Sequence, residues 1–162
     1  MPNDLRHPNP IFMQRAIELA TENVRSGAGG PFAAVIVKNG VVVGEAANSV
    51  TATNDPTAHG EINAIRKACA SLGVFSLKGC EMYTSCEPCP MCLAASYWAR
   101  IDAIYYGNDC DAAARIGFDD SFLYQEFKLD RSARALPSVQ LMPDRAWESF
   151  QAWHDKPDKM EY

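Results

Sequence analysis

The 162-residue sequence has no apolar run long enough to cross a bilayer, no internal repeat and no low-complexity stretch. Its start, MPNDLRHPNP, lacks the apolar core of a secretory signal, so we expect a cytoplasmic protein without a membrane anchor. No run of lysine and arginine could follow a phosphate backbone, and the formal net charge is −5. Membranes and nucleic acids are therefore not expected partners.

What the chain does have is apolar residues and cysteine. Hydrophobic residues make up 48% of the sequence, which is enough for one domain over residues 1–162 to bury a core without disulfide support. The six cysteines are an even number, but thiols in a reducing compartment stay reduced. Clustered cysteines then indicate metal binding or catalysis rather than cross-links.

The first third of the chain predicts a helix followed by a hairpin. Apolar residues between Ile11 and Val24 fall near helical spacing, and the stretch SGAGG at residues 26–30 ends the helix. Two apolar runs that follow are joined by Asn39 and Gly40, a pair whose tolerance of positive φ suits a tight turn. Two antiparallel strands are expected here.

The rest of the chain predicts alternating helices and strands. Residues 54–73 carry one apolar stripe, with Asn54 and Asp55 as candidate N-caps. The later expected elements are a strand at 80–85, a helix at 90–100, a strand at 101–107, a helix at 109–117, an edge strand at 137–143 and a helix at 144–156. We expect a three-layer α/β/α sandwich whose mixed sheet has about five strands, antiparallel at one edge and parallel further in.

Four polar residues cluster at two expected strand-to-helix junctions, where sites gather in such sheets. Cys89 and Cys92 are three residues apart, so both side chains can face one metal ion, and a helix N-terminus stabilises their thiolates. His59 supplies a third ligand from the other junction. Three protein ligands leave the fourth position of tetrahedral zinc open, as in catalytic sites.

Glu61 lies two residues beyond His59, within reach of a water at the open position, and is the expected general acid and base. The order H-x-E followed by P-C-x-x-C is the signature of zinc-dependent nucleobase deaminases. Cys86 offers an alternative C-x-x-C with Cys89, but Pro88 favours the other register. We therefore expect Cys86 to be a packed thiol.

The chain resembles the cytidine deaminase superfamily and, within it, the bacterial guanine deaminases. The segments that carry the resemblance are GGPFAAVIV, NDPTAHGE, YTSCEPCPMC, YWAR, GFDDSF and the terminal DKMEY. The resemblance implies a cytidine-deaminase-like fold, zinc bound by His59, Cys89 and Cys92, and conversion of guanine to xanthine with release of ammonia.

The resemblance also implies a substrate site that spacing alone does not predict. Phe32 and Trp98 would enclose the base, Asn48 would hydrogen-bond it, and Asp120 and Tyr162 would take part in recognition. It further implies a homodimer and a segment of about residues 144–162 that forms a lid or a swapped element over an active site, either that of its own chain or that of the partner.

One position departs from the pattern. Gly60 stands where the resembled enzymes usually carry alanine, and the smaller residue predicts a larger or looser pocket floor. A cytosine or related small-base deaminase is therefore an alternative, and a tRNA adenosine deaminase is a more distant one. An iron–sulfur module is disfavoured, because no further cysteine follows at a short interval.

Overall fold

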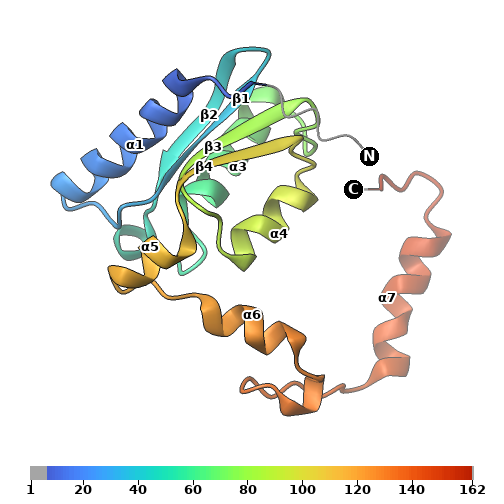
Figure 1. Cartoon of the computed structure of the whole chain (residues 1–162). Coiled ribbons are helices and arrows are strands. Elements are labelled where there is room, and N and C mark those ends of the chain that lie inside the picture. Colours follow the sequence, from blue (N-terminus) through green and yellow to red (C-terminus); the bar gives the residue numbers. More distant parts are fainter. Residues whose placement is uncertain (1–6, 162) are drawn as a thin grey trace. The chain divides into compact units, whose positions relative to one another are not determined.

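The structure of the chain, a computed structural model, describes residues 7–161 and divides after Ser121 into two compact units. The first unit contains a four-stranded sheet in the order β2-β1-β3-β4 (Figure 1). Its strands are β1 (Ala33–Lys38), β2 (Val41–Ala47), β3 (Cys80–Cys86) and β4 (Ala103–Asn108). The expected hairpin is confirmed, because Asn39 and Gly40 join β1 to β2 with φ of 51° and 77°.

The sheet is covered on both faces, which confirms the three-layer α/β/α sandwich (Figure 1). Helix α1 (Pro10–Arg25) packs on the face to which Val35 of β1 points, whereas Ala34 and Ile36 point to the other face. Helix α3 (Gly60–Leu72) packs on that second face, and α4 (Pro90–Trp98) lies in the connection between the parallel strands β3 and β4.

Two expectations about the sheet were wrong. Residues 137–143 form no strand, so the described chain has four strands rather than five; prolines at both ends of that segment limit the hydrogen bonds it can donate. The parallel pair is β3 and β4, and β4 is itself an edge strand. The parallel pairing therefore lies at the edge opposite β2 rather than further in.

The start of the second long helix was also predicted wrongly. Asn54 does not cap it; with φ of 52° this residue ends a short helix, α2 (Val50–Thr53). Asp55 closes a turn instead, since its Oδ1 accepts a hydrogen bond from the Thr57 amide at 2.8 Å. Helix α3 begins only at Gly60, with His59 as its N-cap residue.

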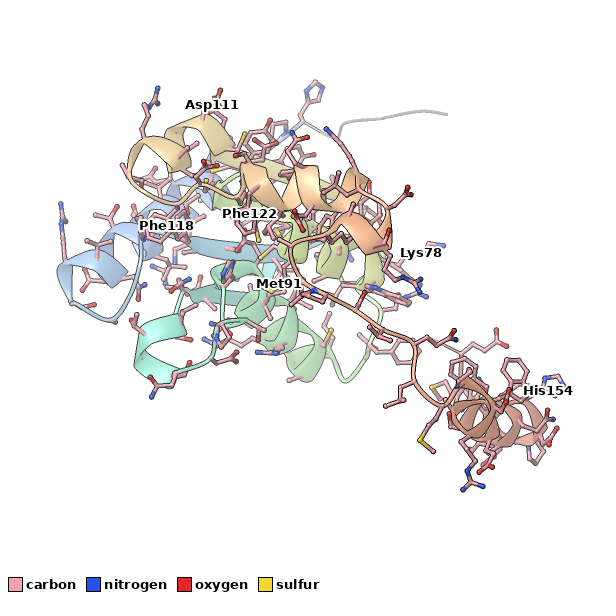
Figure 2. All side chains as sticks on the ribbon, turned by 90° about the horizontal axis from the view of Figure 1, so that it is seen from below. Lys78, Met91, Asp111, Phe118, Phe122 and His154 are labelled. Atoms are coloured by element: carbon pink, nitrogen blue, oxygen red, sulfur yellow. The ribbon has the colours of Figure 1, made fainter. Side chains whose placement is uncertain are left out.

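The second unit, from Phe122 onward, consists of helical segments. After α5 (Cys110–Arg115) of the first unit come α6 (Ser121–Lys128), a 3₁₀ turn (Arg131–Ala133) and α7 (Pro143–Asp155). None of these three segments buries a residue, and the side chains of α7 stand on all sides of its ribbon near His154 (Figure 2). No helix in the described part of the chain is long and apolar enough to span a membrane.

Helix α3 lies unusually close to β2 at Gly44. A Cβ atom at this position would lie 2.6 Å from the Ala68 nitrogen and 2.7 Å from the Ala64 carbonyl oxygen. Glycine ordinarily weakens a strand, and here it is needed for the close approach of two backbones. The absence of a side chain at residue 44 therefore fixes the seating of the helix that carries His59 and Glu61.

We predict that Gly44→Ala destabilises the fold, because the added methyl group must push α3 away from the sheet. Overpacking of this kind costs about 1–3 kcal/mol in the free energy of unfolding. Urea unfolding of the two proteins measures the difference. Val41→Ala is the control in the same strand, since this side chain is 63% exposed and its loss should cost no more than about 0.5 kcal/mol. Equal midpoints for Gly44→Ala and the wild type would contradict the prediction.

Candidate active site

Two helix starts meet at the carboxyl end of β3. His59 is the N-cap residue of α3, and Cys89 is the N-cap residue of α4. Cys92 is the third residue of α4, so its side chain lies one turn from Cys89. The His59 Nδ1 atom lies 3.6 Å from the Cys89 sulfur and 3.5 Å from the Cys92 sulfur. The three expected ligands are thus brought together by elements thirty residues apart.

The spacing of these atoms fits tetrahedral zinc. All three ligand atoms lie within 4.8 Å of one another. Zinc–sulfur bonds of about 2.3 Å and zinc–nitrogen bonds of about 2.0–2.1 Å at a tetrahedral angle would separate nitrogen from sulfur by about 3.5–3.6 Å. Two thiolates and one imidazole are also a donor set that zinc prefers. The residues present therefore fit the metal, and three ligands leave one position open.

The two thiols are electrostatically coupled. The Cys92 sulfhydryl and amide both donate hydrogen bonds to the Cys89 sulfur, and with His59 nearby they lower the pKa of Cys89 to about 4 despite its burial. The same pair raises the pKa of Cys92, and burial and the neighbouring Glu61 add to the rise. The Cys89 thiol, at the start of a helix, therefore ionises more readily than the Cys92 thiol.

Glu61 is placed as a general acid and base requires. It lies in the first turn of α3 and is only 5% exposed. Burial is the main cause that raises its pKa, and the negative charge of Cys89 adds to the rise. Such an environment raises the pKa of a carboxyl group toward neutral pH, where the group can both take and return a proton. His59 and Glu61 are two residues apart and both face the same cavity.

Cys86 is the last residue of β3 and not part of the ligand group among the described residues. Its sulfur donates a weak hydrogen bond to the Asp109 carbonyl oxygen at 3.8 Å. Burial raises its pKa to about 11, and the Glu61 carboxylate contributes. Cys86 is therefore a neutral, buried thiol, as the packed-thiol interpretation expected, although it also lines the cavity.

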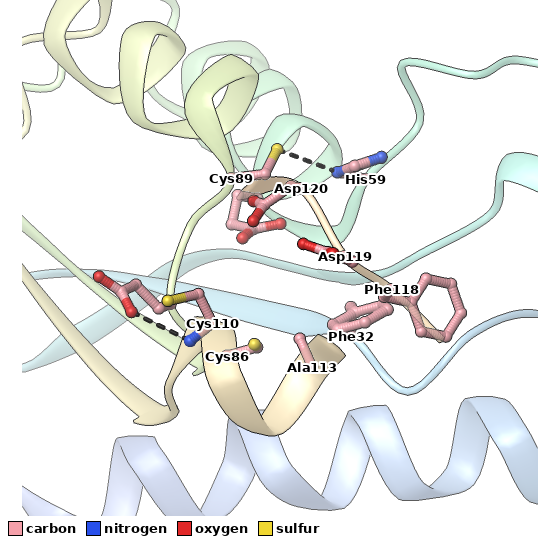
Figure 3. A pocket seen from close by; sticks show the side chains of 11 residues that line it. Phe32, His59, Cys86, Cys89, Cys110, Ala113, Phe118, Asp119 and Asp120 are labelled. Carbon is pink, nitrogen blue, oxygen red and sulfur yellow. Dashed lines mark hydrogen bonds between the residues drawn. The ribbon is translucent and has the colours of Figure 1, made fainter. Parts of the chain in front are cut away.

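A cavity of about 190 Å³ opens beside the ligand group (Figure 3). Phe32 forms an aromatic wall with Phe118, their ring centroids 4.8 Å apart and their planes at 88°. Asp120 lies near Cys89, and burial together with that thiolate raises the pKa of the Asp120 carboxyl. The full lining is Phe32, His59, Glu61, Cys86, Glu87, Cys89, Cys110, Ala113, Phe118, Asp119 and Asp120.

Not all expected substrate residues reach this cavity. Asn48 does not line it; its side chain accepts a hydrogen bond from the Val50 amide at 3.3 Å. Trp98 lies at the end of α4, where its side chain is 66% exposed in a shallow depression with Tyr97 and Arg100. Tyr162 lies outside the described residues. The roles expected of these three residues stay predictions.

The expectation that Gly60 enlarges the pocket floor was wrong. Gly60 is buried and does not line the cavity. The space that a Cβ would take is filled by the backbone of Phe32 and Ala33. The glycine therefore allows these segments to lie closer together.

Several lining residues were not predicted. Phe118 and Asp119 belong to the segment GFDDSF, and Glu87 belongs to SCEPCPMC, so proximity in sequence to expected site residues was the available signal. Cys110 had no such signal. It enters the lining because its amide donates a hydrogen bond to Glu87 Oε2 at 3.1 Å, which draws the start of α5 toward the end of β3 (Figure 3).

Comparison with known proteins agrees with this geometry. A family profile described as the cytidine and deoxycytidylate deaminase zinc-binding region matches residues 8–108, a span that includes the three ligands and Glu61. The chain therefore belongs to the zinc-dependent cytidine and deoxycytidylate deaminase family.

Within that class the chain is similar to guanine deaminase of Bacillus subtilis, with 51% identity over 93% of this chain and 97% of the relative. The X-ray structure of the Bacillus subtilis guanine deaminase superimposes with a TM-score of 0.93 over 96% of this chain and 99% of that one, at 50% identity. A tRNA-specific adenosine deaminase of Agrobacterium fabrum is 44% identical, but over only 56% of this chain and 62% of that protein. The resemblance drawn from the sequence is confirmed.

We predict one zinc ion per chain, lost when either thiolate ligand is removed. Cys89→Ala and Cys92→Ala each leave two ligands for the ion, whereas Cys86→Ala removes a thiol outside the group. Metal content after gel filtration, measured by inductively coupled plasma mass spectrometry, should fall below about 0.1 equivalent in the first two proteins and stay near one in the third. Zinc loss in Cys86→Ala with retention in Cys92→Ala would assign the ligands to the other register.

Proposed function

We propose that the protein is a guanine deaminase, which converts guanine and water to xanthine and ammonia in the cytoplasm. The observation that carries this proposal is the 190 Å³ cavity that two of the expected zinc ligands, His59 and Cys89, line together with Glu61 and Phe32. Similarity to the Bacillus subtilis guanine deaminase over nearly the whole of both chains supports the choice of base. A reducing compartment would keep the ligand thiols available for the metal.

The cavity suits a small, neutral, flat substrate. Its volume lies below the roughly 300–1,000 Å³ of sites for drug-sized ligands, so a single base fits it better than a nucleotide. Glu87, Asp119 and Asp120 add carboxylates to the lining, and ionised carboxylates only accept hydrogen bonds. A base rich in N–H groups satisfies these acceptors, whereas a phosphate group would be repelled.

The chemistry assigned to the chain is proton transfer and orientation. Bound zinc supplies Lewis acidity that activates a water molecule for attack on the carbon bearing the exocyclic amine. Glu61 takes a proton from this water and delivers it to the adjacent ring nitrogen. It then carries the remaining proton of that water, from the hydroxyl group now on the carbon, to the exocyclic nitrogen. The carbon–nitrogen bond breaks, ammonia leaves and the carbonyl group of xanthine remains. Phe32 holds the plane of the base by stacking, which limits the orientations that the base can take.

Two other substrates deserve a direct comparison. Cytosine presents the same amine chemistry on a smaller ring. A tRNA adenosine requires a surface for phosphates, which a net charge of −5 does not favour. Ammonia release should be measured from guanine, cytosine, adenine and a tRNA transcript with the zinc-loaded protein. We expect guanine to be the preferred substrate by kcat/KM; preference for another compound in this panel would overturn the proposal.

We predict that Glu61→Gln keeps the fold and the zinc but loses nearly all turnover, because an amide cannot relay protons. General acid and base catalysis contributes about 10²- to 10⁴-fold, and Glu61 serves several transfers, so we expect a fall in kcat of at least about 10³-fold. Steady-state kinetics and metal content are the measurements. Glu22→Gln, an exposed change on α1, is the matched control and should leave both unchanged. Substantial turnover by Glu61→Gln would remove the proposed role.

We further propose a homodimer in which the second unit of one chain covers the active site of its partner. The three helical segments of this unit bury no residue, yet they carry large apolar side chains such as Phe127, Trp147 and Phe150, each more than 60% exposed. So few residues seldom form a stable core by themselves. A second copy of the chain would supply the surface that these side chains need, and the terminal segment would then exclude water from the partner's cavity.

Deletion of residues 160–162 should leave zinc content and the melting temperature close to the wild-type values but reduce guanine turnover at least tenfold, because the proposed lid is lost. Mixing tests whether the lid acts in trans. The truncated chain keeps Glu61, and full-length Glu61→Gln keeps its tail, so refolding the two together should restore activity that neither has alone. Full activity of the truncated protein would contradict the lid, and no recovery on mixing would contradict the exchange between chains.

A further inference from the structure

We propose that Gly60 is a positioning residue that sets the width of the substrate pocket, an inference that rests on the proposed function. Gly60 stands between the metal ligand His59 and the general base Glu61. It is buried and contributes no lining to the cavity. Its influence therefore comes from what its missing side chain allows on the other side of the helix start.

The backbone at the start of β1 occupies the space that a side chain at residue 60 would need. A Cβ atom there would lie 2.8 Å from Ala33 Cα and 3.1 Å from both the Ala33 nitrogen and the Phe32 carbonyl oxygen. These are backbone atoms, so no rotation of a side chain can relieve the contact. Moving Ala33 Cα out to ordinary contact at 3.4 Å requires a shift of about 0.6 Å.

The peptide between Phe32 and Ala33 is held from its other sides as well. The Phe32 carbonyl oxygen accepts a hydrogen bond from the Asn48 amide at 2.8 Å. The Ala33 amide donates one to Ser85 Oγ at 3.1 Å, and this pair is buried. Displacement of the peptide by a methyl group at residue 60 must lengthen or break these bonds. The position of the peptide is thus set jointly by Gly60, Asn48 and Ser85.

This peptide carries the aromatic wall of the pocket. The Phe32 ring lines the cavity and packs edge-on against Phe118. The metal ligand and the general base lie immediately on either side of Gly60 in the chain. The contact at Gly60 therefore fixes the distance between the groups that react and the ring that stacks on the base. Gly60 shortens the distance between the Phe32 ring and Glu61, so that one flat base stacks on the ring within reach of the carboxyl group.

The test is Gly60→Ala in the full-length, zinc-loaded protein. A wall displaced by about half an ångström stacks less well on the base, and misplacement by about 1 Å can cost about 10²-fold in rate. We expect kcat/KM for guanine to fall about tenfold or more, mainly through a rise in KM. We also expect the ratio of kcat/KM for guanine to that for cytosine to fall, because a looser slot discriminates less between rings of different size. Zinc content should stay near one equivalent.

Gly73→Ala is the matched control, because it is the same substitution at the other end of α3, where φ of 66° strains an alanine but no atom lies within 4 Å of the added methyl group. It should lower the melting temperature without changing KM or the substrate ratio. Ser85→Ala removes the hydrogen bond to the Ala33 amide and so loosens the same peptide, which should also raise KM. This variant keeps the test possible if Gly60→Ala fails to fold. Unchanged KM in Ser85→Ala and in any folded Gly60→Ala protein, or equal kinetic changes in Gly73→Ala, would overturn the inference.

The outcomes for guanine and for Gly60 are separable. The wild-type substrate panel tests the proposed function, and the comparison of variants can be made on whichever base in that panel the wild type turns over. If guanine is not the substrate but Gly60→Ala still raises KM for the base that is, the assignment of guanine fails and the role of Gly60 stands. If guanine is the substrate and Gly60→Ala leaves KM unchanged, the assignment of guanine stands and the role of Gly60 fails.

Discussion

The close approach of His59 Nδ1 to the sulfurs of Cys89 and Cys92, at 3.6 and 3.5 Å, is the constraint on which the rest of the site depends. It can be met only if the starts of α3 and α4 lie together at one end of the sheet. Helix α3 is seated by the glycine contact at residue 44, and α4 follows directly from the carboxyl end of β3. Both helix starts direct amide dipoles toward the same point, which favours thiolates and a carboxylate there.

The local parts of this arrangement could be predicted from the sequence, because they depend on neighbours in the chain. A three-residue interval places Cys89 and Cys92 on one side of a helix start wherever that helix lies. Asn39 and Gly40 define their own turn. The choice of Cys92 over Cys86 as the partner of Cys89 also followed from a local feature, the proline before Cys89. The Cys86 sulfur donates a hydrogen bond to the Asp109 carbonyl oxygen instead.

The wrong expectations concern segments that can adopt more than one structure, where contacts with residues distant in the sequence decide the outcome. Asn54 and Asp55 have the side chains of helix caps, but one adopts a left-handed conformation and the other closes a turn. The segment 137–143 alternates like a strand, yet a strand requires a neighbour with free hydrogen-bonding groups. The role of Gly60 was also hidden, because the backbone that excludes its side chain comes from residues 32–33, almost thirty positions earlier.

The charges around the cavity connect the metal with the proposed substrate. The pKa values of Glu61, Cys92 and Asp120 are all raised, with burial and nearby negative charge among the causes in each case. A divalent cation among the ligands would lower the free energy of these charges, since it offsets the thiolates and favours the ionised Glu61 that the proposed proton transfer requires. The remaining carboxylates at the cavity still oppose any anionic substrate. The same excess of negative charge therefore favours a cation at the ligands and a neutral, N–H-rich base beside it.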